Sequence, residues 1–397
     1  MQLSERMRLL PPYHFADAAA RIAAKRASGV DVISLAMGDP DLPTPDTVIE
    51  RLCETAQKPI NQRYPEYLGM AEFRQAISRW FLARFKVSLD PEREIVPLIG
   101  SKEGLVHLSM ALLDPGDVAL IPDPCYPVYG VGSTLAGATN YSVPLTAEQG
   151  FLPNLEAIPA DVARRAKLLW LNYPNNPTGA IAPADFFHRA VRFAHEYDVL
   201  LVHDMAYADV SFDGYRPLSL LEIPGAQEVA VEFYSFSKAY NMAGFRLGML
   251  VGNAEVVGAL GQLKTNIDTG IFRPLQYAAI EALALPPEWI AQRNLIYQRR
   301  RDLLVAACQR LGLRVESPKA SLYLWPAIPP GQTSKEYAFE LLDRIGVFVT
   351  PGTNFGPGGE GYLRLSLTVP DDRLEEALAR FATLQATNQA EAEVAQS

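Results

Sequence analysis

The sequence predicts an α/β protein with a mostly parallel sheet, helices on both faces of that sheet, and a smaller α+β unit. Between residues 95 and 235, short apolar runs alternate with segments whose apolar residues recur at helical spacing. Strand, helix and strand in close succession are typical of βαβ units, whose strands pair in parallel. After a long helical region that starts near residue 287, shorter strands and helices alternate, and this change predicts the smaller unit.

Length and composition allow two domains. The chain has 397 residues, of which 49% are hydrophobic and 20% are charged, an ordinary globular composition. We expect residues 1–45 to form an N-terminal arm and part of a small domain. Residues 46–285 are expected to form a large domain, and residues 286–397 the rest of the small one.

Local patterns predict the individual elements. Before residue 90 they are helices over 16–27, 45–56 and 70–85 and a strand over 32–35. The strands that follow are expected at 95–99, 118–121, 140–144, 168–172, 199–203 and 229–234. Pro97 indicates that the first of these is an edge strand or has an irregular start, because proline cannot donate to a β-ladder. A helix over 287–311, strands over 322–325, 347–349 and 362–367, and a frayed tail complete the prediction.

Charge and hydropathy argue against several classes of partner. The net charge is −9 and there is no long basic run, which disfavours nucleic acid or an anionic membrane as the main partner. The N-terminus lacks the apolar core of a signal peptide, and no apolar run approaches the length of a membrane span. We therefore expect a soluble, cytoplasmic protein.

The cysteines and histidines predict neither disulfides nor a metal site. The 3 cysteines (Cys53, Cys125 and Cys308) are scattered, form no C-x-x-C motif and have no histidine at metal-ligand spacing. We expect free thiols in a reducing compartment and no bound metal.

Lys238 lies in the segment around which the chain is organised, directly after the expected strand 229–234. Its neighbours in sequence are largely apolar, and desolvation lowers the pKa of an amine. A neutral amine can attack a carbonyl carbon. The alternative is a surface lysine whose aliphatic stem packs on apolar neighbours, which is the commoner meaning of an isolated Ser-x-Lys.

A candidate phosphate site surrounds this lysine. Ser235, Ser237 and Arg246 offer two hydroxyls and a guanidinium, a set that suits a phosphate dianion. Pyridoxal phosphate needs both features, a lysine for its aldehyde and a cradle for its phosphate. The alternative for Arg246 is that it serves only as a structural ion-pair partner.

Asp204 follows the expected strand 199–203. Burying a carboxylate without a partner is costly, so it should face a cation, although a helix N-cap or a turn is the alternative. Opposite a pyridine nitrogen it would keep the ring protonated. Tyr207 and Asn176 can hydrogen-bond a phenolate oxygen of the same ring, and Tyr126 offers a face for stacking. Taken alone, Asn176 is a turn residue before proline and Tyr126 a packing aromatic.

Two further segments concern anions. Gly100-Ser101-Lys102 opens a helix and presents backbone N–H groups, a ready anion site that lacks the spacing of a Walker A loop. Residues 356–361 match G-x-G-x-x-G, but a strand follows where a dinucleotide-binding motif requires a helix, so we reject that function. Arg364 lies inside a strand pattern and either points to solvent or clamps a carboxylate.

The motifs together carry a resemblance. They are Asn176-Pro177-Thr178-Gly179, Asp204-Met205-Ala206-Tyr207, Ser235-x-Ser237-Lys238, Gly244-Phe245-Arg246-x-Gly248 and Arg364-x-Ser366. In this order they resemble the fold-type I, pyridoxal-phosphate-dependent class I/II aminotransferases over nearly the whole chain. The segments 100–104 and 240–244 resemble in particular the bacterial alanine (glutamate–pyruvate) and LL-diaminopimelate aminotransferase branch. Met205 and Phe245 depart from what is usual there. The resemblance implies a sheet of the seven-stranded type in a large domain that binds the cofactor.

The resemblance also implies roles for individual residues. Lys238 would bond the cofactor and shuttle protons, Asp204 would face the ring nitrogen, and Asn176 and Tyr207 would bind the ring hydroxyl. Tyr126 would stack on the ring, and the phosphate would be bound by Ser101, Lys102, Ser235, Ser237 and Arg246. Arg364 would clamp the substrate carboxylate with help from Asn176 and Gly38, and Lys102 would meet the distal group of an acidic substrate. Tyr64 would reach the phosphate of a neighbouring subunit, which implies a homodimer with shared sites.

The implied activity is ping-pong transfer of an amino group between an L-amino acid, such as glutamate or alanine, and a 2-oxo acid. LL-diaminopimelate and aspartate are alternative donors, and side chains such as Tyr13 would select among them. A β-lyase would use the same residues. A non-catalytic effector-binding module of a transcription regulator is disfavoured, because only 37 residues precede Gly38 and leave no room for a helix-turn-helix segment.

Overall fold

The computed structural model describes residues 2–10 and 16–396. Its first half contains α1 (Glu5–Leu9), α2 (Ala16–Ala27), β1 (Ile33–Ser34), α3 (Asp46–Ala56), α4 (Ala71–Phe85), β2 (Ile95–Leu98), α5 (Ser101–Leu112), β3 (Val118–Asp123), α6 (Val128–Ala136), β4 (Thr139–Pro144), α7 (Ala160–Ala163), β5 (Ala166–Leu171), α8 (Ala184–Tyr197) and β6 (Leu200–Asp204). The second half contains α9 (Ala226–Val229), β7 (Ala230–Ser235), α10 (Phe236–Ala239), β8 (Gly248–Gly252), α11 (Ala254–Ile267), α12 (Arg273–Leu283), α13 (Pro287–Arg310), β9 (Tyr323–Leu324), α14 (Ser334–Ile345), β10 (Val347–Phe348), β11 (Thr350–Pro351), β12 (Leu363–Ser366) and α15 (Asp371–Gln396).

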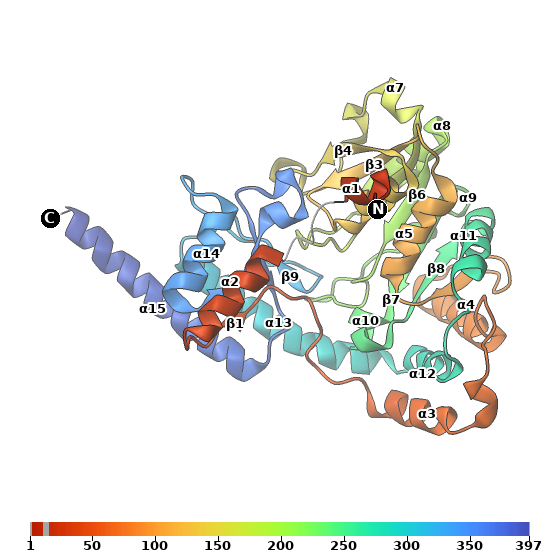
Figure 1. Cartoon of the computed structure of the whole chain (residues 1–397), viewed down its shortest axis with the longest axis horizontal. Helices are drawn as coiled ribbons and strands as arrows, with labels where there is room; N and C mark the ends of the chain where they lie inside the picture. The colour runs from red at the N-terminus through yellow and green to blue at the C-terminus, as the bar shows by residue number, and fades with distance from the viewer. Residues whose placement is uncertain (1, 11–15, 397) are drawn as a thin grey trace.

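A 7-stranded sheet in the order β2-β8-β7-β6-β5-β3-β4 forms the centre of the fold (Figure 1). Every neighbouring pair from β4 to β7 is parallel, whereas β8 runs antiparallel to both β7 and β2. The predicted fold class is confirmed, and β2 with its Pro97 is an edge strand as expected. The sequence reading missed β8, because glycines at both ends of a short run read as a turn.

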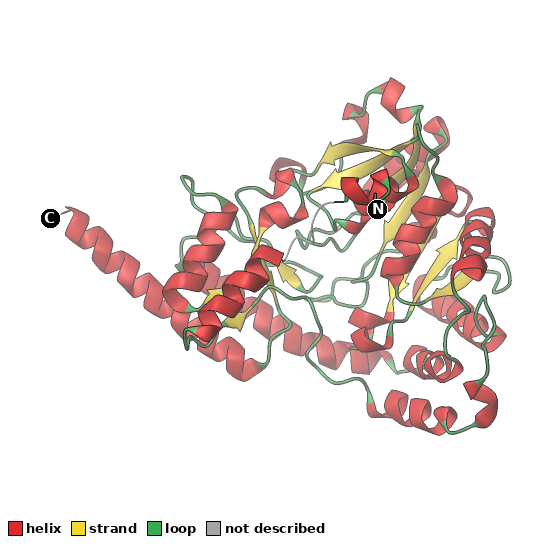
Figure 2. Cartoon of the chain, viewed as in Figure 1, coloured by secondary structure: helices red, strands yellow, loops and turns green. Residues whose placement is uncertain are grey.

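Helices cover both faces of this sheet (Figure 2). Along β5 the side chains alternate between two cores: Leu168 and Trp170 pack in one, and Leu169 and Leu171 in the other. A strand that is buried on both faces appears in the sequence as a continuous apolar run, and this run predicted β5. The alternation gives each layer of helices an apolar surface to cover.

A second group of elements packs around two small sheets, β1-β10 and β11-β12-β9. Helix α13 connects the two parts. Its start packs on the core of the large sheet through Trp289 and Ile290, and its end lies in the core of the small sheets through Leu304 and Cys308. The proposed domain boundaries at residues 45 and 285 remain predictions. The expected frayed tail was wrong, because α15 continues the helix to Gln396 and projects from the molecule (Figure 1).

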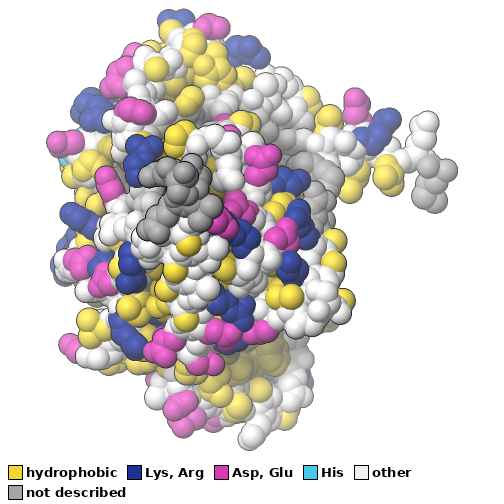
Figure 3. All heavy atoms as spheres, turned by 90° about the vertical axis from the view of Figure 1, so that its left-hand side faces the viewer, with side chains coloured by type: hydrophobic (Ala, Val, Ile, Leu, Met, Phe, Trp, Pro, Cys, Tyr) yellow, Lys and Arg dark blue, Asp and Glu magenta, His cyan; other side chains and the backbone are white. Residues whose placement is uncertain are grey.

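The charged surface and the cysteines agree with what the composition predicts. Basic and acidic side chains alternate over the face shown in Figure 3. The cysteines are free thiols, as expected. Across residues 2–10 and 16–396, no helix is both long and apolar enough to cross a lipid bilayer. The described part also contains no cluster of metal-ligating side chains.

Candidate active site

A cavity of about 510 Å³ opens at the carboxyl ends of the parallel strands. In such sheets this edge is where ligands bind. The cavity brings together nearly all of the side chains predicted from the sequence: Gly38, Ser101, Lys102, Tyr126, Asn176, Asp204, Tyr207, Ser235, Ser237, Lys238, Arg246 and Arg364. Two predicted residues are not among its lining. Tyr64 is 82% exposed, and Tyr13 lies outside the described residues.

Lys238 sits on α10, the single helical turn that follows β7. The Ser235 hydroxyl caps this turn by accepting a hydrogen bond from the backbone N–H of Ser237 at 3.3 Å. Lys238 Nζ donates to the carbonyl oxygen of Gly38 inside the cavity. Burial lowers the pKa of the Lys238 amine, against the smaller opposing effects of Tyr323 and Asp39. This placement excludes the surface-lysine alternative.

Asp204 ends β6 and is 5% exposed. Its Oδ2 accepts a hydrogen bond from the Tyr129 hydroxyl at 2.9 Å, and its Oδ1 accepts one from the Ala206 N–H at 3.2 Å. Burial raises the pKa of this carboxyl group. Among the described side chains no cation forms an ion pair with it, so the expected cationic partner is not another residue of this part of the chain.

Arg364 on β12 is 5% exposed, which excludes the solvent-facing alternative. Its guanidinium donates to Asn176 Oδ1 at 2.9 Å and to the Ala36 carbonyl oxygen at 2.7 Å. The guanidinium carbon lies 4.0 Å from the centre of the Tyr323 ring and 4.5 Å from that of Phe355. Arg364 Nε has no hydrogen-bond partner. A buried cation with an open N–H that lines the cavity is a ready receptor for a carboxylate.

Two phenols meet on the same wall. The Tyr207 and Tyr323 hydroxyls are 3.0 Å apart, and burial together with this contact raises the pKa of Tyr207 well above its ordinary value. Nearby, Asn176 is held by its backbone N–H, which donates to Asn172 Oδ1 at 2.7 Å. Hydrogen bonds therefore fix Tyr207 and Asn176 in place. The raised pKa keeps the Tyr207 phenol protonated at physiological pH.

The lining of the cavity also includes donors for an anion. Ser101 is the first residue of α5, and Arg246, at φ 54°, lies beside it. Gly100 separates the two: a Cβ added there would lie 2.3 Å from Arg246 Nη2. At its φ of +77° a side chain would also be strained. The close approach of backbone to guanidinium thus depends on glycine at position 100.

The sequence did not single out several residues of this cavity, and three of them make hydrogen bonds to its predicted residues. Tyr129 hydrogen-bonds Asp204, Tyr323 packs against Arg364 and Tyr207, and Asn172 donates to the Asp204 carbonyl oxygen at 2.6 Å. Asn172 directly follows β5, a position at which a polar residue is a usable signal. Tyr129 and Tyr323 carry no such signal, because both read as core aromatics.

Comparison with known proteins identifies the family. The model of "Aminotransferase class I and II" matches residues 30–381. The chain belongs to the class I and II aminotransferase family. Among its relatives, the LL-diaminopimelate aminotransferase of Dehalococcoides mccartyi is 53% identical over 97% of this chain and 99% of that protein. The one of Moorella thermoacetica is 51% identical over 96% of this chain and 98% of its own length.

Solved structures agree with this family and fold. Substrate-bound BacF from Bacillus subtilis has a TM-score of 0.92 and 38% identity, covering 97% of this aminotransferase and 98% of BacF. A mutant aspartate aminotransferase of Thermus thermophilus has a TM-score of 0.90 and 31% identity, covering 96% and 99% of the two chains. The predicted recognition and enzyme class are confirmed. The family implies pyridoxal phosphate and amino-acid and 2-oxo-acid substrates.

Proposed function

We propose that this aminotransferase acts on LL-diaminopimelate, passing its amino group to a 2-oxo acid in two alternating half-reactions. The observation that carries the chemistry is a half-buried amine, Lys238, in one cavity with Arg364, whose Nε is open. The donor is supported by the relatives, which share 46–53% identity over nearly the whole chain and are named LL-diaminopimelate aminotransferases. Glutamate or alanine as donor is the competing proposal.

The side chains present fit pyridoxal phosphate. Asp204 is a buried carboxylate without an ion-pair partner in the described chain, and a protonated ring nitrogen would supply its cation. Ser101, Ser235, Ser237, Lys102 and Arg246 would hold the phosphate, and Tyr126 would stack on the ring. Asn176 and Tyr207 would bind the ring hydroxyl. When bound, the cofactor supplies an electron sink for the carbanion at the substrate Cα.

Lys238 would then move the proton. A lowered pKa leaves more of the amine neutral near pH 7, and a neutral amine can accept the proton from the substrate Cα. Arg364 would orient the substrate by its α-carboxylate, with Asn176 already bonded to the same guanidinium. The Tyr323 and Phe355 rings against Arg364 exclude water from that contact and strengthen it.

The distal end of the substrate decides specificity. LL-diaminopimelate carries a second carboxylate, and so do glutamate and aspartate. Lys102 is exposed but lines the cavity, which suits an ion pair with such a group. Tyr13 is a further candidate from the sequence.

Mixing single amino acids with the cofactor-loaded enzyme, and following its visible absorbance, tests the donor. LL-diaminopimelate is expected to discharge the absorbance rapidly and alanine slowly. Glutamate discharges it under either proposal if 2-oxoglutarate is the acceptor, because each half-reaction is reversible, so the response to LL-diaminopimelate decides between them. Rapid discharge by alanine with none by LL-diaminopimelate would contradict the proposal in favour of the alanine branch. Release of pyruvate from a sulfur amino acid without any 2-oxo acid would instead favour the β-lyase alternative.

Substitution of Arg364 by lysine tests the carboxylate clamp. We expect KM for the amino donor to rise about 10- to 100-fold, because a hydrogen bond to a charged group contributes about 1.5–3 kcal/mol. Lysine keeps the charge but loses the planar fork. Cofactor absorbance should stay normal. An unchanged KM would show that the carboxylate binds elsewhere.

Substitution of Arg246 by glutamine tests the phosphate end. The Kd of the cofactor-free protein for pyridoxal phosphate, measured by absorbance titration, should rise about 10- to 100-fold for the same reason. Arg310→Gln, on an exposed arginine, is the matched control. Equal affinities in the two variants would remove Arg246 from the cradle.

We also propose a homodimer. Exposed apolar side chains gather on the segment that carries Tyr64, with Ile60 54%, Tyr67 52% and Leu68 42% exposed. Such a concentration is typical of an interface. Light scattering would give the oligomeric state, and a monomer at working concentration would contradict the sharing of sites through Tyr64. A cytoplasmic location stays a prediction.

A further inference from the structure

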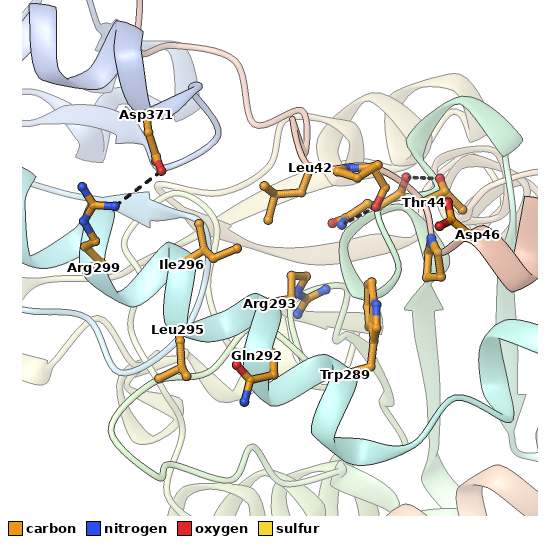
Figure 4. A pocket seen from close by; sticks show the side chains of 13 residues that line it. Leu42, Thr44, Asp46, Trp289, Gln292, Arg293, Leu295, Ile296, Arg299 and Asp371 are labelled. Atoms are coloured by element: carbon orange, nitrogen blue, oxygen red, sulfur yellow. Dashed lines mark hydrogen bonds and ion pairs between the residues drawn. The ribbon is translucent and has the colours of Figure 1, made fainter.

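Arg293 of α13 lies behind the active site. It is 4% exposed and lines a separate cavity of about 600 Å³ between α13 and the loop over 42–45 that leads into α3. In Figure 4 it lies between α13 and the loop that carries Thr44, whereas Arg299 on the same helix reaches Asp371 at the other end of the pocket. Arg293 is not among the residues that line the candidate active site.

The guanidinium of Arg293 has an acceptor for each of its N–H groups. Nη1 donates to the carbonyl oxygens of Lys238, at 2.7 Å, and of Ala239. Nη2 donates to the carbonyl oxygen of Asp209 and to Asn294 Oδ1 at 2.7 Å, and Nε donates to the same Oδ1 at 3.2 Å. Five contacts match the five donors of a guanidinium.

These contacts join two segments of the candidate site. Lys238 and Ala239 belong to the turn after β7, and Asp209 lies in the segment that follows Asp204 at the end of β6 and carries Tyr207. The Asp209 anchor is itself fixed. Its carboxylate accepts from the Arg84 guanidinium at 3.2 Å and from the Tyr234 hydroxyl, and its carbonyl also accepts from Asn294 Nδ2 at 3.0 Å.

The arrangement is unfavourable as a purely structural device. In the described part of the chain no carboxylate forms an ion pair with Arg293, and its hydrogen bonds all go to neutral acceptors. The Asp209 carboxylate attracts this guanidinium from beyond ion-pair distance but is itself paired with Arg84. Burial of a charge without a direct ion-pair partner is costly. The turn it binds also needs outside support, because α10 is 4 residues long and a single turn has little stability of its own.

We propose that Arg293 is a positioning residue that sets the place of Lys238 relative to Asp204 and Tyr207 by pinning both backbone segments from behind. The proposal rests on the proposed role of Lys238. A reacting group displaced by about 1 Å can lose about 10²-fold in rate, so a fixed backbone under the lysine matters to the chemistry. Substrate binding at Arg364 does not depend on this contact.

Arg293→Gln, Arg293→Lys and the matched control Arg299→Gln test this. Arg299 is an exposed arginine of the same helix, 3.5 Å from Asp371. We expect Arg293→Gln to lower kcat about 10- to 100-fold with KM nearly unchanged. The pH midpoint of the visible absorbance of bound cofactor should move upward, because a loosened turn exposes the lysine nitrogen to water. Arg293→Lys should recover part of both, and Arg299→Gln should match the wild type.

Each outcome bears on the proposal. A lower Tm of Arg293→Gln with unchanged kcat and unchanged midpoint would overturn it in favour of a structural role. If Arg293→Gln does not fold, Arg293→Lys decides: a reduced kcat with a shifted midpoint supports the proposal, and wild-type values of both overturn it. A wild-type enzyme with neither cofactor absorbance nor transamination would instead refute the proposed function.

Discussion

Replacement of Lys238 by alanine is expected to lower kcat by at least about 10⁴-fold and to abolish the visible absorbance that depends on the lysine nitrogen. General acid–base transfer by one positioned group contributes about 10²–10⁴-fold, and loss of the covalent attachment adds to it. The amine is the only hydrogen-bond donor of this side chain, and its Nζ donates to the Gly38 carbonyl oxygen. Absorbance spectra and single-turnover rates measure the two effects.

Lys167→Ala is the matched control, because Lys167 is an exposed lysine of the same sheet. It should retain wild-type kcat and absorbance. Wild-type turnover in Lys238→Ala would refute the proposed mechanism outright, since no other described lysine lines the cavity except the exposed Lys102.

Asp204→Asn is the second change with a large expected effect. An amide cannot stabilise a protonated ring nitrogen, and loss of one partner of a buried ion pair costs about 3–5 kcal/mol, or roughly 10²–10⁴-fold in kcat. Tyr129→Phe removes only the hydrogen bond to Asp204 Oδ2 and should have a much smaller effect. Asp161→Asn, on an exposed carboxylate of α7, should change nothing.

The same substitution should stabilise the cofactor-free protein at neutral pH. Burial raises the pKa of Asp204, so the folded protein binds this proton more tightly than the unfolded chain does. The stability contributed by this group is therefore present below the ordinary aspartate pKa of about 4, and falls as pH rises through the raised value. Asparagine does not titrate, so the variant does not lose this stability as pH rises.

Thermal unfolding of the cofactor-free wild type and of Asp204→Asn, followed between about pH 4 and pH 8, measures this effect. Tm of the variant should exceed that of the wild type increasingly as pH rises. A lower Tm of the variant across the range would mean that the carboxylate has a stabilising partner in the cofactor-free fold. With cofactor added, the order should reverse, because the ring nitrogen then supplies the cation.

Much of the fold was predictable because its signals are local. The central strands are buried on both faces, so each appears as an apolar run between helical patterns. β8 was not predictable in this way. Its glycines carry no side chain to pack, and its place between β2 and β7 depends on hydrogen bonds to strands far away in the sequence.

The residues of the candidate site also divide into those with a local sequence signal and those without one. Lys238, Asp204 and Ser235 lie directly after or at the ends of apolar strands, where polar residues stand out. Tyr323 is hydrogen-bonded to Tyr207 across 116 positions, and Arg293 reaches Lys238 from a different helix. No pattern within a short window encodes such a pair.

The sequence by itself determined the fold class, the family resemblance and the set of reactive side chains, because periodicity and motifs are properties of neighbouring residues. Only the tertiary structure decided which polar atoms are buried, which of them keep an open hydrogen bond, and which side chains hold the reactive ones from behind. Those properties depend on desolvation and on contacts between distant segments, and both arise only when the chain packs.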